Sequence, residues 1–133
     1  MELRGRTVNS GDVESEAVVL DSPFNFTSDF DPRTGALCIK GHPLDGTTIG
    51  NKILIIPGAK GAVTAAITIY HAKKMGNAPA AILCRKADPI TVECAMVIDI
   101  PMLDAFEKDL LEVIRTGDHV RVLGEKGLIT IEY

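Results

Sequence analysis

The sequence predicts an α/β fold: a mixed sheet with a central parallel βαβαβ unit and β elements at both ends of the chain. Three observations lead to this prediction. A continuous apolar run at 53–56 is followed by a glycine-bearing turn, a helix-like stretch and a second apolar run at 80–84. A helix-start signal at Asp88 and a third short apolar run at 100–103 extend the alternation. Alternating runs near both termini favour strands outside this unit, so a layered β/β/α domain is the expected form.

Length and composition indicate one ordinary globular domain. The 133 residues can bury a core but are too few for two comfortable domains, so we interpret 1–133 as a single domain. A net charge of −4 and the lack of a basic tract argue against nucleic acid and anionic lipid as partners. The N-terminus has no hydrophobic signal segment, and the apolar runs are too short to span a bilayer. We therefore expect a cytoplasmic protein that binds neither nucleic acid nor membrane.

The first fifty residues have the composition of short strands and turns. Strands are expected at 3–8 and 16–20, and the turn-forming residues at 9–12 between them predict a hairpin or a broad β-turn connection. Alternation at 24–26 indicates a short edge strand, and a further strand is expected at 36–40. Most polar side chains in this part are expected only to satisfy turns.

The central unit contains the candidate ligand loop. The run at 53–56 is rich in β-branched residues and has no polar position, which predicts a strand covered on both sides. From Ala62 to about Met75 apolar residues recur every three or four positions, which predicts a helix, and Gly76 suits its end. In βαβ units, ligands are met at the carboxyl end of the first strand. The loop at 57–62 is therefore the candidate ligand site.

The last third of the chain predicts two helices, a strand and a hairpin. Asp88 is suited to cap a helix and Pro89 to begin it, with an end near Ile98. The other predicted elements are a short buried strand at 100–103, an amphipathic helix at 104–114, and strands at 119–123 and 128–133 joined by a turn at 124–127.

The loop at 57–62 offers a possible anion site without matching a nucleotide-binding motif. Gly58 and Gly61 do not have the spacing of a P-loop. A loop that leads into a helix N-terminus exposes unpaired backbone N–H groups, and with Lys60 beside them it would attract a carboxylate or phosphate. The alternative is that the glycines only permit a tight strand-to-helix turn. Physical chemistry alone leaves both interpretations open.

The cysteines and histidines do not suggest a metal site in this chain. Cys38, Cys84 and Cys94 are odd in number and have no CxxC spacing, so we interpret them as small buried hydrophobic residues. No metal-ligand spacing joins the three histidines. We therefore expect this chain to bind no metal or cofactor itself.

The predicted central helix carries apolar residues outside its core-facing stripe. Val63, Ile67 and Tyr70 lie off the expected core-facing stripe, which is formed by Ala62, Ala66 and Ile69. Such a broad apolar face indicates contact with a partner, or additional packing within the molecule.

Seven segments, taken in order along the chain, are similar to a known family: GDVESEA at 11–17, DPRTG at 31–35, GNKIL at 50–54, PGAKG at 57–61, NAPAAI at 77–82, ADPI at 87–90 and TGDHV at 116–120. On these segments, which span nearly the whole chain, the sequence resembles the small subunit of the aconitase X family. The resemblance implies the swivelling β/β/α domain of aconitases. It also implies a heterodimer with a separate large subunit, which carries an iron–sulfur cluster or another metal, and the removal of water from a bound substrate. Activities known in the family are dehydration of mevalonate 5-phosphate and of cis-3-hydroxy-L-proline.

The candidate loop departs from the pattern of that family. The family loop usually reads Pro-Ser-Gly-Lys/Arg-Gly-Ser, and its last serine is held to be the catalytic base. In this sequence that position is Ala62, which has no transferable proton, and Gly58 replaces the first serine. Thr64 retains a hydroxyl two residues on, but it would point to a different side of the first helical turn. Glu93 stands where relatives usually have a small residue, and it is either a replacement proton acceptor or a solvated or paired glutamate.

Three hypotheses follow. The first, which we favour, is the small subunit of an aconitase X-type hydro-lyase with altered chemistry or substrate, in which Gly58, Lys60 and Gly61 bind the substrate. The Lys60 side chain and the N–H groups of Gly61 and Ala62 would hold its anionic group. The second is a noncatalytic binding or regulatory subunit that retains the swivel fold. The third is an unrelated β/α module that binds an anion at the same loop. An adjacent gene for a large subunit would favour the first two hypotheses, and its absence would favour the third.

Overall fold

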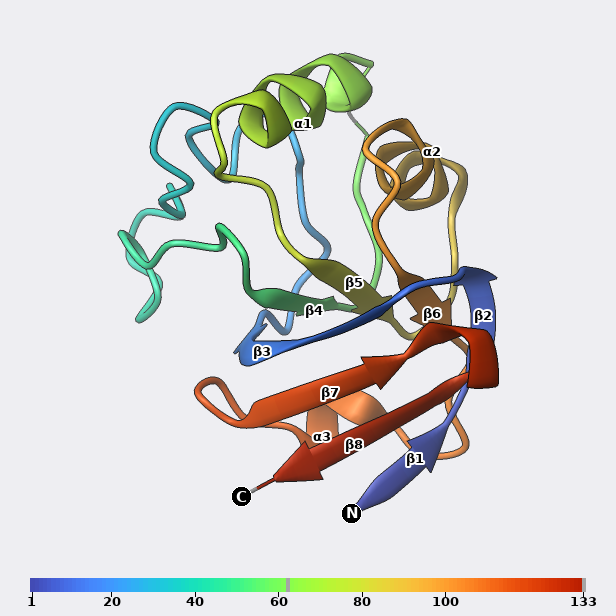
Figure 1. Ribbon diagram of the computed structural model, residues 1–133. Helices are drawn as coiled ribbons and strands as arrows, with labels where there is room; N and C mark the ends of the chain where they lie inside the picture. Colours follow the sequence, from blue (N-terminus) through green and yellow to red (C-terminus); the bar gives the residue numbers. More distant parts are fainter. Residues whose placement is uncertain (62, 133) are drawn as a thin grey trace.

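A helical layer, a parallel sheet and an antiparallel sheet are stacked in that order (Figure 1). The computed structural model describes residues 1–61 and 63–132. Within these residues there are eight strands, three α-helices and one 3-10 helix. In chain order they are β1 (Glu2–Arg4), β2 (Arg6–Asn9), β3 (Asp12–Val19), β4 (Ile53–Ile56), α1 (Ala65–Lys74), β5 (Ala81–Cys84), α2 (Pro89–Val97), β6 (Met102–Asp104), α3 (Leu110–Val113), β7 (His119–Leu123), η1 (Gly124–Lys126) and β8 (Leu128–Glu132).

Strand β3 joins the two sheets. Its residues 12–16 pair antiparallel with β7, and its residues 17–19 pair parallel with β4. The strands β4, β5 and β6 are parallel to one another, whereas β1, β8 and β7 are antiparallel. The complete order is β1-β8-β7-β3-β4-β5-β6-β2. The predicted mixed sheet around a parallel β4-α1-β5-α2-β6 unit is therefore confirmed.

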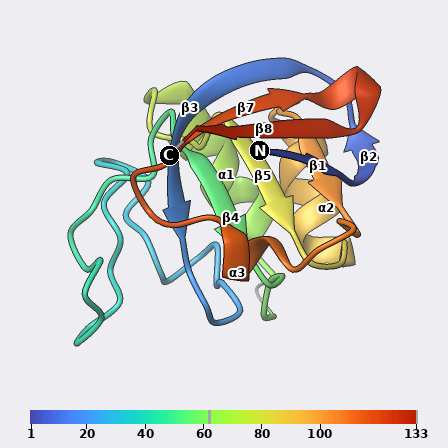
Figure 2. The same ribbon diagram turned by 90° about the horizontal axis from the view of Figure 1, so that it is seen from below.

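The parallel sheet separates two hydrophobic cores. Leu54 and Ile56 of β4 face the core under the helices, whereas Ile53 and Ile55 face the core shared with α3, β7 and β8. All four side chains are fully buried. Figure 2, seen from below, shows α3 in front of the parallel strands and α1 and α2 behind them. Because both faces of β4 are covered, its sequence at 53–56 has no polar position.

Helix α1 begins later than the sequence predicts. Val63 and Thr64 form a turn, and the first helical residue is Ala65. Ala62, the predicted first residue, lies outside the described residues. The helix ends at Lys74, one residue before the predicted end.

The predictions for α2 and for the C-terminal hairpin are confirmed. Helix α2 begins at Pro89, and the Asp88 side chain caps it by accepting a hydrogen bond from the Thr91 N–H. Strands β7 and β8 pair antiparallel, with η1 between them. Tyr133, the predicted end of the last strand, lies outside the described residues.

Of the two connections considered for the N-terminal strands, the hairpin is wrong. Strand β2 pairs with β6, and β3 pairs with β7 and β4. The strand expected at 3–8 is also split at Gly5, whose N–H donates to the Gly127 carbonyl at 2.8 Å. A Cβ at Gly5 would lie 2.7 Å from the Phe106 ring. Turn-forming residues show where a chain bends but not which strand the next segment pairs with.

The strands expected at 24–26 and 36–40 are also wrong. In the described chain these segments form only isolated bridges, such as that between Phe24 and Ala59. Phe24 and Phe26 are buried under the helices, and their rings pack edge to face with centroids 4.9 Å apart. The apolar alternation at 24–26 is therefore explained by two aromatic side chains, Phe24 and Phe26, that hold a loop against the core.

The helix expected at 104–114 is wrong over most of its length, since it is limited to the four residues of α3. Asp104 is the last residue of β6, and Ala105 has a positive φ of 51°. Phe106 and Leu110 still contact the core below the parallel sheet. The apolar spacing is thus explained by packing of an irregular segment.

Candidate functional site

The loop between β4 and α1 is held on both flanks. On one side, the Phe24 N–H donates to the Gly58 carbonyl at 2.9 Å, and the Lys60 N–H donates to the Phe24 carbonyl at 3.0 Å. On the other side, the Ala59 N–H donates to Asp88 Oδ2 at 2.9 Å. Two amides of the loop are therefore used within the molecule.

Asp88 contacts the loop in addition to capping α2. Its Oδ1 accepts the Thr91 N–H at 2.9 Å, and its Oδ2 accepts the Thr91 hydroxyl at 2.8 Å. A Cβ at Gly58 would lie 3.0 Å from Oδ2, so a larger residue there would press on the carboxylate. The sequence predicts the cap, but the contact with Ala59 is missed because it joins residues 29 apart in the chain. No local sequence pattern predicts the contact between Asp88 and Ala59, because this contact follows from the pairing of β4 with β5.

An open hollow of about 410 Å³ lies where this loop meets α2. The described residues that line it are Gly61 and Val63 on the loop side and Pro89, Ile90 and Glu93 on α2. Two of the predicted site residues, Gly61 and Glu93, are thus brought together. The Gly61 N–H makes no hydrogen bond to any residue in the described part of the chain. The hollow therefore combines an amide donor, a carboxylate and apolar walls.

Lys60 lies at a second, smaller hollow. This hollow has a volume of about 90 Å³, and Asp29 and His42 also line it. The Lys60 side chain is exposed. The structure therefore does not place Lys60 at the hollow that Gly61 shares with Glu93. Its flexible stem lets the ammonium group move relative to the loop backbone.

Thr64 and Ala62 complete the predicted site residues. The Thr64 hydroxyl lies 3.0 Å from the Thr27 hydroxyl, and the Thr64 side chain does not cap α1. Thr64 is not part of the described lining of the hollow at Gly61 and Glu93. Ala62, which the family resemblance predicts to be at the serine position, lies outside the described residues.

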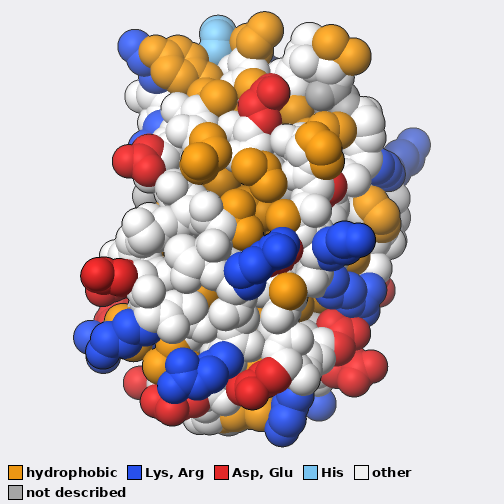
Figure 3. All heavy atoms as spheres, turned by 90° about the vertical axis from the view of Figure 1, so that its right-hand side faces the viewer, with side chains coloured by type: hydrophobic (Ala, Val, Ile, Leu, Met, Phe, Trp, Pro, Cys, Tyr) orange, Lys and Arg blue, Asp and Glu red, His pale blue; other side chains and the backbone are white. Residues whose placement is uncertain are grey.

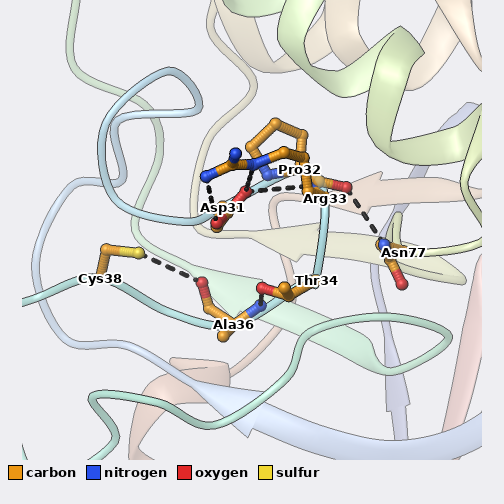
Figure 4. Close-up of polar contacts among 7 residues, drawn as sticks. All are labelled: Asp31, Pro32, Arg33, Thr34, Ala36, Cys38 and Asn77. Atoms are coloured by element: carbon orange, nitrogen blue, oxygen red, sulfur yellow. Dashed lines mark hydrogen bonds and ion pairs between the residues drawn. The ribbon is translucent and has the colours of Figure 1, made fainter.

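A polar cluster in the long connection between β3 and β4 lies beyond the predicted site (Figure 4). Arg33 donates to Asp31 Oδ1 from Nε at 3.2 Å and from its backbone N–H at 2.9 Å, and to Oδ2 from Nη2 at 3.3 Å. These hydrogen bonds hold the pKa of the Asp31 carboxyl below its usual value. Asn77, just after α1, donates to the Pro32 carbonyl at 3.1 Å. The segment is a turn, as the sequence predicts, and it is tied to the helical layer.

The cysteines of this chain do not fit an iron–sulfur cluster. Cys84 and Cys94 are buried, and burial raises the pKa of each thiol to about 12, so both remain protonated. Cys38 is exposed, which corrects the expectation that it is buried, and its thiol donates to the Ala36 carbonyl at 3.5 Å. Across residues 1–61 and 63–132, no three His, Cys, Asp or Glu side chains are grouped so that they could hold a metal.

Exposed apolar side chains gather on the helical layer. Val63, Ile67 and Tyr70 are exposed, as predicted, and Met96 and Val97 of α2 are exposed as well. The buried residues of α1 are Ala65, Ile69 and Ala72, so the prediction that Ala66 faces the core is wrong. Figure 3 shows hydrophobic side chains concentrated in the upper half of the face seen there, at the level of the helices. None of the helices that the structure describes is long and apolar enough to cross a bilayer.

The three layers, with a candidate ligand loop at the carboxyl end of β4, define a swivelling β/β/α domain. A family model described as the aconitase X swivel domain matches residues 2–131. The chain therefore belongs to the aconitase X swivel-domain family, as the resemblance of its sequence segments predicts. This membership rules out the hypothesis of an unrelated β/α module.

Several known proteins are similar over their full length. The phosphomevalonate dehydratase small subunit of Methanosarcina mazei is 36% identical over 131 residues, which cover 98% of this chain and 91% of the relative. The protein of the same name from Methanocella arvoryzae is 37% identical, with 98% of this chain and 99% of the relative covered. The crystal structure of Thermococcus kodakaraensis aconitase X in its holo form matches with a TM-score of 0.91 and 33% identity, covering 100% of this chain and 99% of that chain.

Proposed function

We propose that this chain is the small subunit of an aconitase X-type dehydratase, a hydro-lyase that removes water from a small anionic hydroxy acid. Mevalonate 5-phosphate is the proposed substrate, because full-length relatives carry the name phosphomevalonate dehydratase small subunit. The relatives named above give no support to cis-3-hydroxy-L-proline, the other substrate expected from the resemblance. Residues 1–133 then act as one swivel domain, and a large subunit completes a heterodimer.

The observation that supports this proposal most directly is the joint position of Gly61 and Glu93 at one hollow. The hollow lies at the carboxyl end of β4, where βαβ domains bind ligands. The Gly61 N–H is a donor for an anionic oxygen, and the Glu93 carboxylate can accept a proton. Only two elements contribute the described lining, so a second subunit is needed to enclose a substrate and exclude water.

The proposed roles divide binding from proton transfer. Lys60 supplies the positive charge for the phosphate or carboxylate of the substrate, and Gly58 lets the loop approach Asp88. Glu93 is the proposed proton acceptor in place of the family serine, whose position is Ala62. Lys60 and Glu93 line different hollows, so in this proposal the flexible Lys60 side chain has to reach from its own hollow to the anionic group at the Gly61 N–H. Thr64 is a weaker candidate because its hydroxyl contacts Thr27.

The metal chemistry of the proposed enzyme belongs to the large subunit. Aconitase X-type enzymes are expected to carry an iron–sulfur cluster or another metal, and the described residues of this chain do not group three side chains that could hold one. We therefore assign to this chain only substrate binding and proton transfer.

A noncatalytic binding subunit is the second candidate function. The observation that favours it is Ala62 itself, since alanine cannot transfer a proton. In that case the swivel fold and the apolar face of the helical layer would serve association with the large subunit alone.

Reconstitution with the large subunit tests the proposal. The two subunits are produced together and separately, and the dehydration of mevalonate 5-phosphate is followed for each preparation. We expect turnover by the complex and none by either subunit alone. Equal turnover by the large subunit alone would reject a catalytic role for this chain and support the noncatalytic alternative. No turnover by the complex would reject mevalonate 5-phosphate as the substrate.

A further inference from the structure

One carboxylate connects the candidate loop to the start of α2. Asp88 Oδ1 accepts the Thr91 N–H, which is the cap, whereas Oδ2 accepts the Ala59 N–H at 2.9 Å. The second contact is not needed to cap a helix, because one oxygen satisfies the first-turn amide. The contact with the Ala59 N–H therefore constrains the loop. Oδ2 also accepts the Thr91 hydroxyl at 2.8 Å, but only Oδ1 accepts the first-turn amide, so a substitution at Oδ2 can remove the loop contact and keep the cap.

The contact with Asp88 is one of two that leave the Gly61 amide as the unused donor of the loop. The Ala59 N–H is used by Asp88, and the next amide, that of Lys60, is used by the Phe24 carbonyl at 3.0 Å. Gly61 follows, and its N–H makes no hydrogen bond within the described residues while its backbone borders the hollow. Release of the Ala59 amide would allow the loop to rotate and would move the Gly61 amide relative to the hollow.

Asp88 is itself held from the sheet. Its neighbour Ala87 donates its N–H to Asp104 Oδ2 at 2.6 Å, and Asp104 is fully buried. Arg6 donates to the same carboxylate from Nε at 2.9 Å and from Nη2 at 2.7 Å. The backbone just before Asp88 is thus tied to Asp104, the last residue of β6, which fixes the position of the Asp88 carboxylate. A fixed acceptor of this kind can preorganise a binding loop.

We infer that Asp88 is a positioning residue of the dehydratase, which holds the loop so that Gly61 and Lys60 meet the anionic group of the substrate. This inference rests on the proposed function. Asp88 does not contact the substrate in this role, and it transfers no proton. Its loss therefore affects substrate binding and leaves the chemical step almost unchanged.

The substitution Asp88→Asn separates the loop contact from the cap. Asparagine caps helices about as well as aspartate, and its Oδ1 can still accept the Thr91 N–H. Its amide nitrogen replaces Oδ2 and presents a donor to the Ala59 N–H, so that contact is lost. Asp88→Ser is a second variant, because serine also caps but is too short to reach Ala59. Asp118→Asn is the matched control, since the Asp118 side chain accepts a backbone N–H three residues away, that of Arg115 at 2.8 Å, in the turn before β7.

The variants are compared with wild type as complexes with the large subunit, with mevalonate 5-phosphate as the substrate. We expect both Asp88 variants to raise KM about tenfold, the loss typical of a hydrogen bond to a charged group. We expect kcat to stay within about twofold, because a purely structural defect would instead lower the active fraction and hence kcat. The amide of Ala59 should exchange with deuterium at least about tenfold faster in both variants. Asp118→Asn should change neither KM nor the exchange rate of the Ala59 amide.

An unchanged KM in both Asp88 variants, with an active wild type, would overturn the inference. Loss of the cooperative thermal transition in both variants would also overturn it, because Asp88 would then be required for the fold itself. If the wild-type complex does not dehydrate mevalonate 5-phosphate, the proposed function fails separately. The exchange of the Ala59 amide then still decides the matter: unchanged exchange overturns the hold on the loop, and faster exchange supports it.

Discussion

The buried carboxylate of Asp104 accepts two hydrogen bonds from the guanidinium of Arg6, one to each oxygen, at 2.9 and 2.7 Å. The two residues are register partners across the antiparallel pair β6 and β2. A carboxylate that is fully buried is stable only when such partners satisfy its charge. The pair therefore fixes the edge strand β2, and through the Ala87 amide it also fixes the segment that leads into α2.

Removal of this carboxylate should destabilise the fold. We expect Asp104→Ala to lower the free energy of unfolding by about 2–4 kcal/mol, because the buried Ala87 amide and the Arg6 donors lose their acceptor. Urea denaturation of the purified chain measures the change. The matched control is Glu16→Ala, which removes an exposed carboxylate 3.5 Å from the Lys52 ammonium and should cost less than about 1 kcal/mol. Equal losses in the two variants would contradict this account of Asp104.

The charge of Lys60 should affect substrate affinity. We expect Lys60→Ala to raise KM for mevalonate 5-phosphate at least about tenfold in the complex, because a charged donor to the anionic group is lost. The fold should be unaffected, since the side chain is exposed. Steady-state kinetics and thermal unfolding are the two measurements. Lys40→Ala removes another exposed lysine and should leave KM unchanged, whereas a normal KM in Lys60→Ala would exclude Lys60 from the binding site.

The carboxylate of Glu93 should affect the chemical step. We expect Glu93→Gln to lower kcat about 100-fold, because glutamine cannot accept the proton, while KM changes little. The turnover rate of the complex at saturating substrate measures kcat. Glu112→Gln changes another exposed glutamate, on α3, and should behave as wild type. A kcat equal to that of wild type in Glu93→Gln would identify Glu93 as a solvated surface residue.

The buried thiols should make the chain less stable at high pH. Burial raises the pKa of Cys84 and Cys94 from 9.0 to about 12 in the folded state. Between these values the unfolded chain releases two protons that the folded chain retains, so stability falls as pH rises from 9 to 12. The slope is at most about 1.4 kcal/mol per pH unit for each thiol. Below about pH 8 both thiols are protonated in the folded and in the unfolded chain, so they contribute almost no pH dependence there.

Unfolding by urea at several alkaline pH values measures this slope. The double variant Cys84→Ala, Cys94→Ala should lose the part of the slope that the thiols contribute. Cys38→Ala should retain it, because Cys38 is exposed. Identical pH dependence in the double variant and in wild type would show that other groups cause the alkaline loss.

Local sequence patterns predict those elements whose own residues decide the structure. The run at 53–56 predicts a strand covered on both faces, since each of its side chains needs an apolar partner. Asp88 followed by Pro89 predicts the start of α2, because the capping oxygen and the amide it accepts lie three residues apart. The expected N-terminal hairpin failed for the opposite reason: the partners of β2 and β3 lie about a hundred residues away in sequence.

The features of the candidate site also divide into those that local sequence predicts and those that depend on contacts distant in sequence. The sequence by itself predicted the class of fold and the position of the glycine loop, since these depend on residue type and local spacing, and its resemblance to the family implies that Ala62 stands at the serine position. Only the tertiary structure decided that Gly61 and Glu93 share a hollow, that Lys60 lines another, and that Asp88 holds the loop. Those relationships depend on strand order, which is set by the burial of two cores summed over the whole chain and therefore leaves no local signal.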